Sequence, residues 1–353
     1  MRVRRCGEPG AVSIMTVPVR IACFGEMLLR LAAPRGARLS GADALGVYVG
    51  GAEANVAIGL AHLGAPSTMI TVLADNPLGD LALAELRRHG VDTRAVRRAE
   101  GRMGLYFLER GAGARPARVV YDRQDSAFCR ALSAEQPWAA LLEGCDWLHV
   151  SGITAALGTA ACAAVLAAVR TARELRLGVS FDCNYRPSLW QGRTAQAGAL
   201  LAGIAAHAEV LFASEYDLAL MLRQPAPTHS SPDSFVRAAR AAFEHLSNLR
   251  QVACTFRLGR GPDAQALSAA CVTRDGDFRS GPHELRGIVE RIGSGDAFAA
   301  GLLYGVHGSF DPQHAVEFAT AAAVVKHSLG TDFSQATAEE LEALLRGDSA
   351  LVR

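Results

Sequence analysis

The sequence predicts an α/β fold in which a central, mostly parallel sheet carries helices on both faces. Short apolar runs recur along the 353-residue chain, and each is followed by a stretch with helical periodicity. The runs are almost continuously apolar rather than alternating, which is typical of strands that are buried on both faces. Strands that alternate with helices build parallel sheets, so we expect three layers with the sheet in the middle.

Six apolar runs are the candidate strands: Ile21–Phe24, Thr68–Leu73, Trp147–Val150, Gly178–Asp182, Val210–Phe212 and Val252–Phe256. The stretches predicted to be helical are Glu53–Leu63, Leu78–His89, Thr159–Leu175, Thr194–His207, Asp217–Leu222 and Asp296–Val306. Ligands of such sheets bind beyond the carboxyl ends of the strands. Polar residues that follow candidate strands are therefore candidates for a site, namely Asp182, Asn184, Arg186, Ser214, Asp217 and Asp296.

Two segments depart from this alternation of strands and helices. Residues near Leu39–Val49 and Arg102–Tyr121 combine short alternating runs with Gly-rich turns. They predict a small antiparallel β flap, inserted at about residues 27–50 and 101–124. Such a flap is either an ordinary surface hairpin or a lid that closes over substrate and excludes water. An apolar flap face would serve a closing lid or a homodimer in which two flaps cover each other.

The two ends of the chain are expected to lie outside the folded domain. Residues 1–18 are predicted to be a disordered extension, residues 19–346 the domain, and residues 347–353 a tail. Arg2, Arg4 and Arg5 precede no apolar core of the length that a signal peptide needs. Translation could start at Met1 or at Met15.

The composition excludes several classes of function. Half of the residues are hydrophobic and the formal net charge is +1, so neither a nucleic-acid partner nor a membrane surface is indicated. No apolar run reaches the roughly 18 residues of a membrane span. The eight cysteines form no CxxC pair, so we expect no protein-built metal site and no disulfide framework. Unpaired cysteines in apolar runs predict a reducing, cytoplasmic location.

The glycine-flanked aspartate of Gly293-Ser294-Gly295-Asp296 is the most informative motif. A glycine-rich turn that opens a helix presents backbone N–H groups to an anion, and the helix dipole favours negative charge there. An aspartate repels an anion, but it can take a proton from a hydroxyl while the amides hold a phosphoryl group. The alternative is a helix-capping aspartate after a tight turn.

Other phosphate and nucleophile motifs do not explain the chain. It contains neither a GxxxxGK[ST] phosphate loop nor a GxSxG nucleophile turn, and it lacks the protein-kinase HRD and DFG elements. Gly259-Arg260-Gly261 with Ala264 fits a dinucleotide motif only loosely, because Pro262 interrupts it and no regular helix follows.

The segment Gly50-Gly51-Ala52-Glu53-Ala54-Asn55, together with Gly293–Asp296, resembles the two signatures of the ribokinase-like (PfkB-type) sugar kinases. The likeness runs from about Arg20 to Leu345. Finer segments resemble 2-keto-3-deoxygluconate kinases, namely Gly104–Tyr106, Val120–Arg123 and Asp182–Trp190. The resemblance implies a ribokinase-like fold with a β lid. It also implies transfer of the γ-phosphate of ATP, with Mg²⁺ held mainly by phosphates and water, to the terminal hydroxyl of 2-keto-3-deoxygluconate.

The resemblance also implies a role for each candidate residue. Asp296 is the base, and the amides of Gly293, Ser294 and Gly295 form the anion hole. The substrate side comprises Gly51, Asn55, Tyr106, Tyr121, Arg123 and Arg186, in which the two arginines would clamp a carboxylate. The nucleotide side comprises Asn184, Ser214, Asp217, Thr255 and Gly259. For an isolated arginine or tyrosine, a surface or packing role is the alternative.

Three departures from the family pattern concern the nucleotide and a cation. Ser214 and Asp217 stand where relatives have an Asn-x-x-Glu element, and Thr255–Gly259 lacks the usual lysine. Glu290-Arg291-Ile292 replaces an Asp-Thr-Thr whose aspartate often helps to bind a monovalent cation. A potassium requirement is therefore doubtful, and Arg291 is a hypothetical replacement for the cation. Lys326-His327 either borders adenine or complements a helix end.

Two rival functions remain open. The chain could phosphorylate another sugar, such as fructose, ribose or 5-dehydro-2-deoxygluconate. It could also be a non-catalytic relative that binds a sugar or a nucleotide. The complete Gly293–Asp296 element favours catalysis, because a binding protein gains nothing from a base at an anion site.

Overall fold

The computed structural model describes residues 19–112, 115–258 and 265–348. The predicted extension at residues 1–18, including Met15, lies outside these residues, as does most of the predicted tail. Within the described residues, ten strands form one large sheet. Their order is β13 (Asp277–Arg279), β12 (Gln265–Thr273), β11 (Gln251–Leu258), β10 (Val210–Phe212), β9 (Gly178–Asp182), β8 (Trp147–Ser151), β1 (Ile21–Phe24), β4 (Ser67–Ala74) and β5 (Val96–Ala99), with β14 (His283–Leu285) paired to β12.

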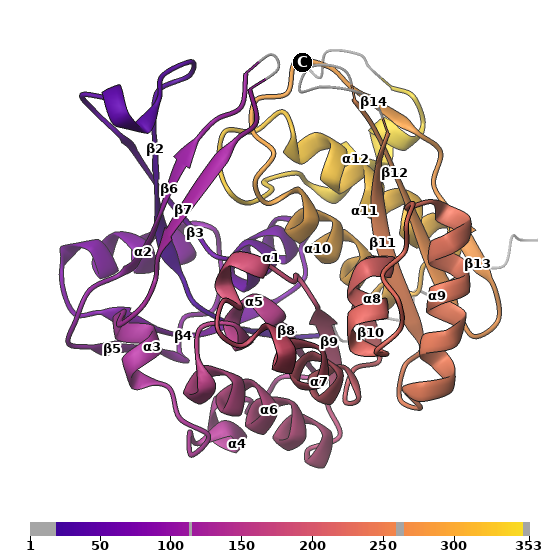
Figure 1. Ribbon diagram of the computed structural model, residues 1–353, viewed down its shortest axis with the longest axis horizontal. Helices are drawn as coiled ribbons and strands as arrows, with labels where there is room; N and C mark the ends of the chain where they lie inside the picture. The colour runs from indigo at the N-terminus through magenta and orange to yellow at the C-terminus, as the bar shows by residue number, and fades with distance from the viewer. Residues whose placement is uncertain (1–18, 113–114, 259–264, 349–353) are drawn as a thin grey trace, which may run out of the picture.

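The sheet is parallel from β5 to β11 and antiparallel beyond β11 (Figure 1). All six predicted strands belong to it, which confirms the predicted parallel core. Strands β1 and β4 are buried along their whole length, as expected for strands that helices cover on both faces.

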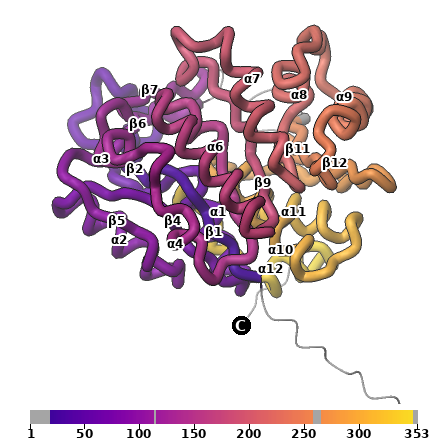
Figure 2. The backbone as a smooth tube through the Cα atoms, turned by 90° about the horizontal axis from the view of Figure 1, so that it is seen from below, coloured from indigo at the N-terminus to yellow at the C-terminus, as the bar shows by residue number. Residues whose placement is uncertain are grey.

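Helices cover both faces of the sheet and create two main apolar cores. One core includes residues of α4 (Trp138–Leu141), α5 (Gly152–Ala155), α6 (Thr159–Glu174), α7 (Thr194–Ala205), α8 (Glu215–Met221) and α9 (Pro232–His245). The other includes residues of α1 (Ala52–His62), α2 (Pro77–Arg88), α10 (Ser294–His307) and α11 (Pro312–Lys326). Figure 2 shows α7 and α9 on one side of the strands and α10 and α12 on the other. The predicted three-layer α/β fold is thereby confirmed.

The remaining short elements lie at the periphery. Helix α12 (Ala338–Leu345) packs on α11, and α3 (Ala127–Ala131) contacts β4. Two 3₁₀ turns cover Leu39–Gly41 and Pro187–Leu189. No helix in the described part of the chain is long and apolar enough to cross a bilayer.

Two of the helices illustrate capping residues that are visible in the sequence. The Asn76 side chain accepts hydrogen bonds from the N–H groups of Leu78 and Gly79 at the start of α2, and Asp311 does the same for α11. In both helices a proline occupies the first turn, where its missing N–H costs no hydrogen bond.

Helices α1 and α10 pack closely side by side. A Cβ atom placed on Gly59 of α1 would lie 3.0 Å from the Cβ of Ala300 of α10. Glycine at this position permits the close approach. The N-termini of both helices face the same cleft, which is described below.

Four strands form a second, smaller sheet, which we call the lid. Its order is β3 (Gly46–Gly50), β2 (Leu28–Ala32), β6 (Gly104–Glu109) and β7 (Arg118–Asp122). The outer pairs are antiparallel, as predicted, but the central β2–β6 pair is parallel. The lid projects from the layered body at the upper left of Figure 1. Val47, Val119 and Val120 are exposed on it.

Candidate active site

A cleft of about 850 Å³ lies beyond the carboxyl ends of β9 and β10 and along part of β11, between the lid and the start of α10. Its lining includes fourteen of the fifteen residues to which the family resemblance assigns a role: Gly51, Asn55, Tyr106, Tyr121, Arg123, Asn184, Arg186, Ser214, Asp217, Thr255, Gly293, Ser294, Gly295 and Asp296. The fifteenth, Gly259, lies outside the described residues. The fold therefore brings together residues that are up to 245 positions apart in the sequence.

The glycine-rich turn before α10 forms one wall of the cleft. Gly293 has a φ of +80°, and a Cβ there would lie 1.5 Å from the carbonyl oxygen of Asp332, so only glycine fits. A Cβ on Gly295 would meet no atom within 4 Å. Within the described residues, no side chain caps α10. The Ser294 N–H donates 3.3 Å to the Arg291 carbonyl, whereas the N–H groups of Gly295 and Asp296 have no partner in the described part of the chain. These two amides remain available to an anion, at the positive end of a 14-residue helix.

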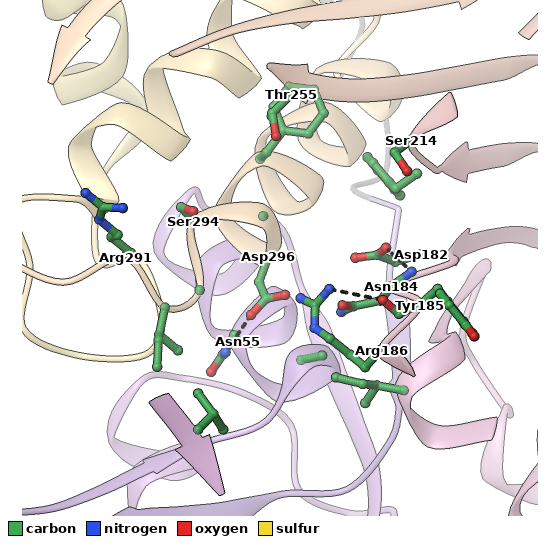
Figure 3. Close-up of a pocket in the computed structure, with 18 of the residues that line it drawn as sticks. Asn55, Asp182, Asn184, Tyr185, Arg186, Ser214, Thr255, Arg291, Ser294 and Asp296 are labelled. Atoms are coloured by element: carbon green, nitrogen blue, oxygen red, sulfur yellow. Dashed lines mark hydrogen bonds between the residues drawn. The ribbon is translucent and has the colours of Figure 1, made fainter. Parts of the chain in front are cut away.

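Asp296 lies in the first turn of α10 and points into the cleft toward α1 (Figure 3). Asn55 Nδ2 donates a hydrogen bond of 2.6 Å to Asp296 Oδ2. Burial raises the pKa of Asp296 to about 7, although the Asn55 hydrogen bond and the Arg186 charge lower it. A carboxylate with a pKa near neutrality is suited to general-base work.

Asn55 is positioned by the double-glycine segment at the start of α1. A Cβ on Gly51 would lie 2.3 Å from the carbonyl oxygen of Glu26, so the chain can enter the helix here only through glycine. Asn55 is almost fully buried, and its Oδ1 accepts no hydrogen bond from any described residue. A buried amide oxygen without a partner on the wall of a cleft is available to a ligand hydroxyl.

Asp182, Asn184 and Arg186 follow β9. Asn184 has a φ of +40°, a conformation that asparagine tolerates, and its N–H donates 3.0 Å to Asp182 Oδ1. Burial and the nearby Asp296 charge raise the pKa of Asp182 to about 8, against the lowering effect of Arg186. In Figure 3 the Arg186 guanidinium lies between Asp296 and Asn184. Arg186 is thus the positive charge between two carboxyl groups.

The lid side of the cleft carries Tyr106, Tyr121 and Arg123. Tyr106 is buried and donates 2.6 Å to Asp332 Oδ2, and its ring centroid lies 6.3 Å from that of Tyr121. Arg123 Nε donates 2.6 Å to the buried Glu26. The terminal nitrogens of Arg123 have no partner in the described part of the chain, so they remain for a ligand.

The nucleotide candidates Ser214 and Asp217 form a capping box at the start of α8. Asp217 Oδ2 accepts from the Ser214 N–H and from its hydroxyl, both at 2.7 Å, and Ser214 Oγ accepts 3.2 Å from the Asp217 N–H. The departure from the family's Asn-x-x-Glu pattern therefore has a local structural use. Thr255 lies on β11 and lines the same end of the cleft.

Arg257 and Asp332 line the cleft but were not selected from the sequence. Arg257 Nη2 donates 2.9 Å to Ser294 Oγ at the start of α10. Burial and the charges of Arg291 and Arg186 lower the pKa of Arg257, which indicates a cluster of positive charge facing the anion turn. Arg257 lies two residues after Thr255 on one strand, and this period of two was the available signal. Asp332 follows α11 in a loop without a local pattern.

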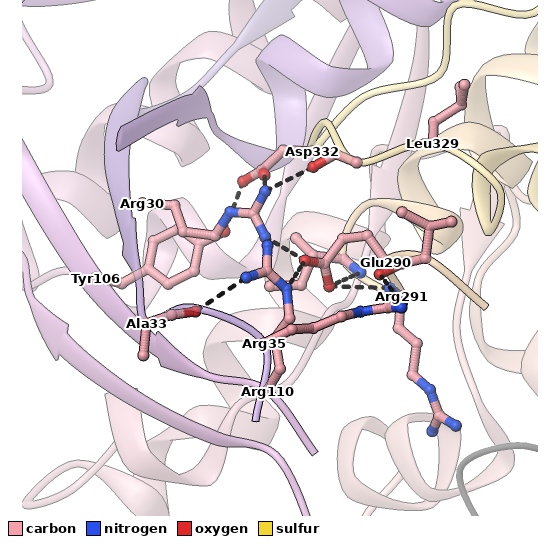
Figure 4. A network of polar contacts seen from close by, with 12 residues as sticks. Arg30, Ala33, Arg35, Tyr106, Arg110, Glu290, Arg291, Leu329 and Asp332 are labelled. Carbon is pink, nitrogen blue, oxygen red and sulfur yellow. Dashed lines mark hydrogen bonds and ion pairs between the residues drawn. The ribbon is translucent and has the colours of Figure 1, made fainter. Parts of the chain in front are cut away.

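A buried polar network ties the lid to the anion turn (Figure 4). Arg30 of β2 is fully buried; it binds Glu290, donates 3.0 Å to the Gly330 carbonyl and pairs with Asp332 Oδ1 at 2.8 Å. Arg110 Nε donates 3.0 Å to Glu290 Oε2, and Glu290 Oε1 accepts from the N–H groups of Arg291 and Ile292. Both oxygens of Glu290 are therefore occupied by groups of this chain.

No cluster of three or more His, Cys, Asp or Glu side chains suited to a metal ion occurs among the described residues.

Comparison with known proteins shows that residues 19–337 match the sequence model of the pfkB family of carbohydrate kinases. The chain belongs to the pfkB family. As a member of this family it is a carbohydrate kinase, an enzyme that transfers a phosphoryl group to a sugar hydroxyl.

Three relatives illustrate the place of this pfkB family member. The chain is 31% identical over 329 residues to the 2-dehydro-3-deoxygalactonokinase of Haloferax volcanii, covering 93% of this chain and 96% of that protein. It is 26% identical to the 5-dehydro-2-deoxygluconokinase of Geobacillus thermodenitrificans, covering 85% and 84%. The crystal structure of the Thermotoga maritima 2-dehydro-3-deoxygluconokinase superimposes with a TM-score of 0.88 at 36% identity, covering 93% and 100%. This superposition confirms the ribokinase-like fold.

Proposed function

We propose that this carbohydrate kinase transfers the γ-phosphoryl group of ATP to the terminal hydroxyl of 2-keto-3-deoxygluconate (2-dehydro-3-deoxygluconate). The observation that carries the proposal is the 2.6 Å hydrogen bond between Asn55 and Asp296. It joins the helix that follows the double glycine, on the sugar side, to the turn that presents amides to a phosphoryl group. A hydroxyl held at this junction lies beside a base and an anion site at once.

In the proposed reaction, the sugar hydroxyl oxygen forms a bond to the γ-phosphorus as the bond from that phosphorus to the bridging oxygen of ADP breaks. Asp296 accepts the hydroxyl proton. The first amides of α10 hold the oxygens of the transferring group, with Ser294 fixed by its hydrogen bond from Arg257. Arg257 and Arg186 add positive charge where the phosphates carry negative charge.

A sugar acid is the substrate class that the arginines favour. Arg186 and the terminal nitrogens of Arg123 face the cleft and can bind a carboxylate, while Glu26 fixes the Arg123 side chain from behind. Tyr106 and Tyr121 supply a flat wall, and Asn55 Oδ1 supplies an acceptor for a hydroxyl. The named activities of the Haloferax and Thermotoga relatives support a 2-keto-3-deoxy acid.

Another acid is the closest alternative, because the Geobacillus relative is a 5-dehydro-2-deoxygluconokinase. Fructose and ribose lack a carboxylate, so they would leave the arginines without a partner. A non-catalytic sugar- or nucleotide-binding relative is the alternative from a different class. It gives no reason for a carboxylate with a raised pKa beside free helix amides.

ATP and Mg²⁺ fit the residues that are present. The cleft volume of about 850 Å³ is in the upper part of the range for ligand pockets, as two substrates require. Thr255, Ser214, Asp217 and Asn184 would border the nucleotide. Mg²⁺ would neutralise phosphate charge when bound. It would be held mainly by phosphate oxygens and water, since the described residues offer no ready ligand cluster.

The lid suggests a homodimer, which we include in the proposal. Val47, Val119 and Val120 are exposed by 52%, 40% and 43% on the four-stranded sheet, and Val119 also lines the cleft. A second copy of the chain that covered these valines would bury their apolar surface and would also close the cleft.

We place the activity in the cytoplasm, where ATP is available and where the unpaired cysteines of the described residues would stay reduced.

A substrate panel tests the proposal. ADP release would be measured with a coupled assay for 2-keto-3-deoxygluconate, 2-keto-3-deoxygalactonate, 5-dehydro-2-deoxygluconate, fructose and ribose. We expect the highest kcat/KM with a 2-keto-3-deoxy acid. A higher kcat/KM with fructose or ribose would overturn the assigned substrate class. The absence of ADP release with every sugar, despite measured ATP binding, would favour the non-catalytic alternative.

A further inference from the structure

Lys326 has no role in the mechanism above, yet both its residue type and its burial are unusual for this chain. It is the only lysine among the 36 lysine and arginine residues of the sequence. It is the last residue of α11, and its side chain is fully buried. A buried ammonium group is costly unless it is paired, and lysines are rarely buried completely. A chain that uses arginine at every other basic position keeps its one lysine where a charge is hardest to accommodate.

The Lys326 side chain lies directly behind the anion turn. A Cβ on Gly293 would lie 3.4 Å from Lys326 Cε, so the two residues are in contact distance of each other. Lys326 Nζ donates 3.3 Å to the Leu329 carbonyl. No carboxylate oxygen of the described residues lies within 4.0 Å of Nζ. The ammonium group is therefore held by a backbone carbonyl rather than neutralised by a direct ion pair.

The charged groups that act on Lys326 come from several elements around it. Asp296 of α10, Glu290 before α10 and Asp332 after α11 favour the charged ammonium, whereas Arg30 of β2 opposes it. The neighbouring His327 donates 2.6 Å from Nδ1 to the Ala323 carbonyl and stays neutral at pH 7, because burial lowers its pKa to about 4. Burial lowers the pKa of Lys326 to about 8. Lys326 is thus mostly charged at neutral pH.

We propose that Lys326 is a positioning residue of the phosphoryl site, whose buried ammonium acts as a built-in cation behind the Gly293 turn. The positive charge adds to the field of the α10 amides and stabilises the phosphoryl group that they hold. This inference rests on the proposed function. The sequence analysis suggested that Arg291 replaces a monovalent cation. We now assign that electrostatic role to Lys326, because Arg291 lines the cleft itself.

The compact shape of lysine explains why arginine does not serve at this position. An ammonium group is a point charge with three donors on a flexible stem, whereas a guanidinium group is wide and planar. The space behind Gly293 is filled by Lys326 Cε and by the Asp332 carbonyl. A wider head group would push against the turn whose geometry holds the phosphoryl group.

The single lysine permits a direct test by NMR spectroscopy. Protein grown with ¹³Cε-labelled lysine should give one side-chain signal, whose titration reports the pKa of Lys326 alone. We expect a pKa of about 8 in the free enzyme. Saturation with a non-hydrolysable ATP analogue should raise this pKa, because a phosphate anion nearby favours the charged form. An unchanged pKa, with analogue binding verified by calorimetry, would overturn the proposal.

Kinetics of Lys326→Met give a second test, since methionine has a similar length and no charge. We expect kcat to fall about tenfold to a hundredfold at pH 7. The variant removes a positive charge that lies near the phosphoryl site but does not touch the phosphoryl group, so its effect is partly screened. The KM for the sugar should change little. The decline of wild-type kcat above about pH 8 should disappear in the variant. The proposal would be contradicted if Lys326→Met had the same kcat as the wild type and the same decline of kcat above about pH 8.

His327→Gln is the matched control, because it alters the adjacent buried position without removing a charge at pH 7. It should keep the decline of kcat at high pH. If Lys326→Met does not fold, the NMR titration of the wild-type enzyme decides alone. That titration needs nucleotide binding but no turnover. A failed substrate panel would therefore refute the proposed function without deciding the role of Lys326.

Discussion

Asn55 donates a 2.6 Å hydrogen bond to Asp296, which lies 241 residues further along the chain. The bond connects the first turns of α1 and α10, two helices that start at glycine-rich segments and open onto the same cleft. It also sets the protonation of the aspartate, because a donor to a carboxylate favours the ionised form. The sugar side and the phosphoryl side of the cleft thus meet in one contact.

Asp296→Asn should abolish most turnover while nucleotide binding is retained. Asparagine keeps the size of the side chain but cannot accept the hydroxyl proton, so we expect kcat to fall about 10²- to 10⁴-fold. The coupled ADP assay measures turnover, and calorimetry with an ATP analogue measures binding. Turnover close to that of the wild type would refute the role of Asp296 as the base.

Asn55→Ala should shift the pH dependence of the reaction. Asp296 must be ionised to act as a base, so wild-type kcat/KM should rise with pH through about 7. Loss of the Asn55 donor raises the pKa of Asp296, and the rise should move to higher pH. Asn248→Ala is a suitable control, since Asn248 donates to the Ala206 carbonyl and does not line the cleft. An unshifted profile in Asn55→Ala would show that another group limits the rate.

Arg186→Ala should discriminate between acid and neutral substrates. We expect kcat/KM to fall about 10- to 100-fold more for the sugar acid than for fructose, because both substrates lose the charge near the phosphates but only the acid loses a charged hydrogen bond. Arg186 also lowers the pKa of Asp296, so rates should be compared above pH 8. Arg250→Ala, which removes a highly exposed arginine paired with Glu209, is the control. Equal losses for both substrates would remove the carboxylate-binding role.

Arg30→Met should destabilise the protein by about 3–5 kcal/mol, because it leaves two buried carboxylates without their shared partner. Urea denaturation measures the free energy of unfolding. The double variant Arg30→Met/Glu290→Gln should recover part of the loss, since it removes one of the two buried carboxylate charges that Arg30 balances, while Arg110 still contacts position 290. No difference between the single and the double variant would show that the Arg30–Glu290 pair contributes little.

Potassium should not activate the enzyme. Both oxygens of Glu290 already accept hydrogen bonds from Arg30, Arg110 and the following amides, so the carboxylate has no free position for a cation. Activity would be titrated with potassium chloride, with choline chloride added to hold the ionic strength constant. A large, saturable activation would contradict this expectation.

Much of the fold could be predicted because buried parallel strands are continuously apolar. The six predicted strands lie in the sheet, and Ile21–Phe24 matches β1 residue for residue. Strand β12 was missed because Gln265–Thr273 is rich in alanine, and it pairs with β11 in an antiparallel manner. The parallel pairing of β2 with β6 joins segments more than 70 residues apart, which no local pattern reveals.

The site followed from glycine-rich motifs because such turns carry their conformation in the sequence. The supporting groups did not follow. Tyr106 reaches Asp332 across 226 residues, and Arg30 reaches Glu290 across 260. Partnerships of this kind arise from tertiary packing alone. Asp332 in particular lies in a loop without a sequence pattern, although its carbonyl lies against Gly293 and its carboxylate accepts a hydrogen bond from Tyr106.

The close packing of Gly59 against Ala300 sets the spacing between the two helices that carry Asn55 and Asp296. A methyl group added at position 59 would wedge α1 away from α10 without touching any ligand. A substitution inside the protein, one helical turn away from Asn55, would therefore change the distance between Asn55 and Asp296, the proposed base. Rate differences between kinases with identical cleft linings could originate at such a buried helix crossing.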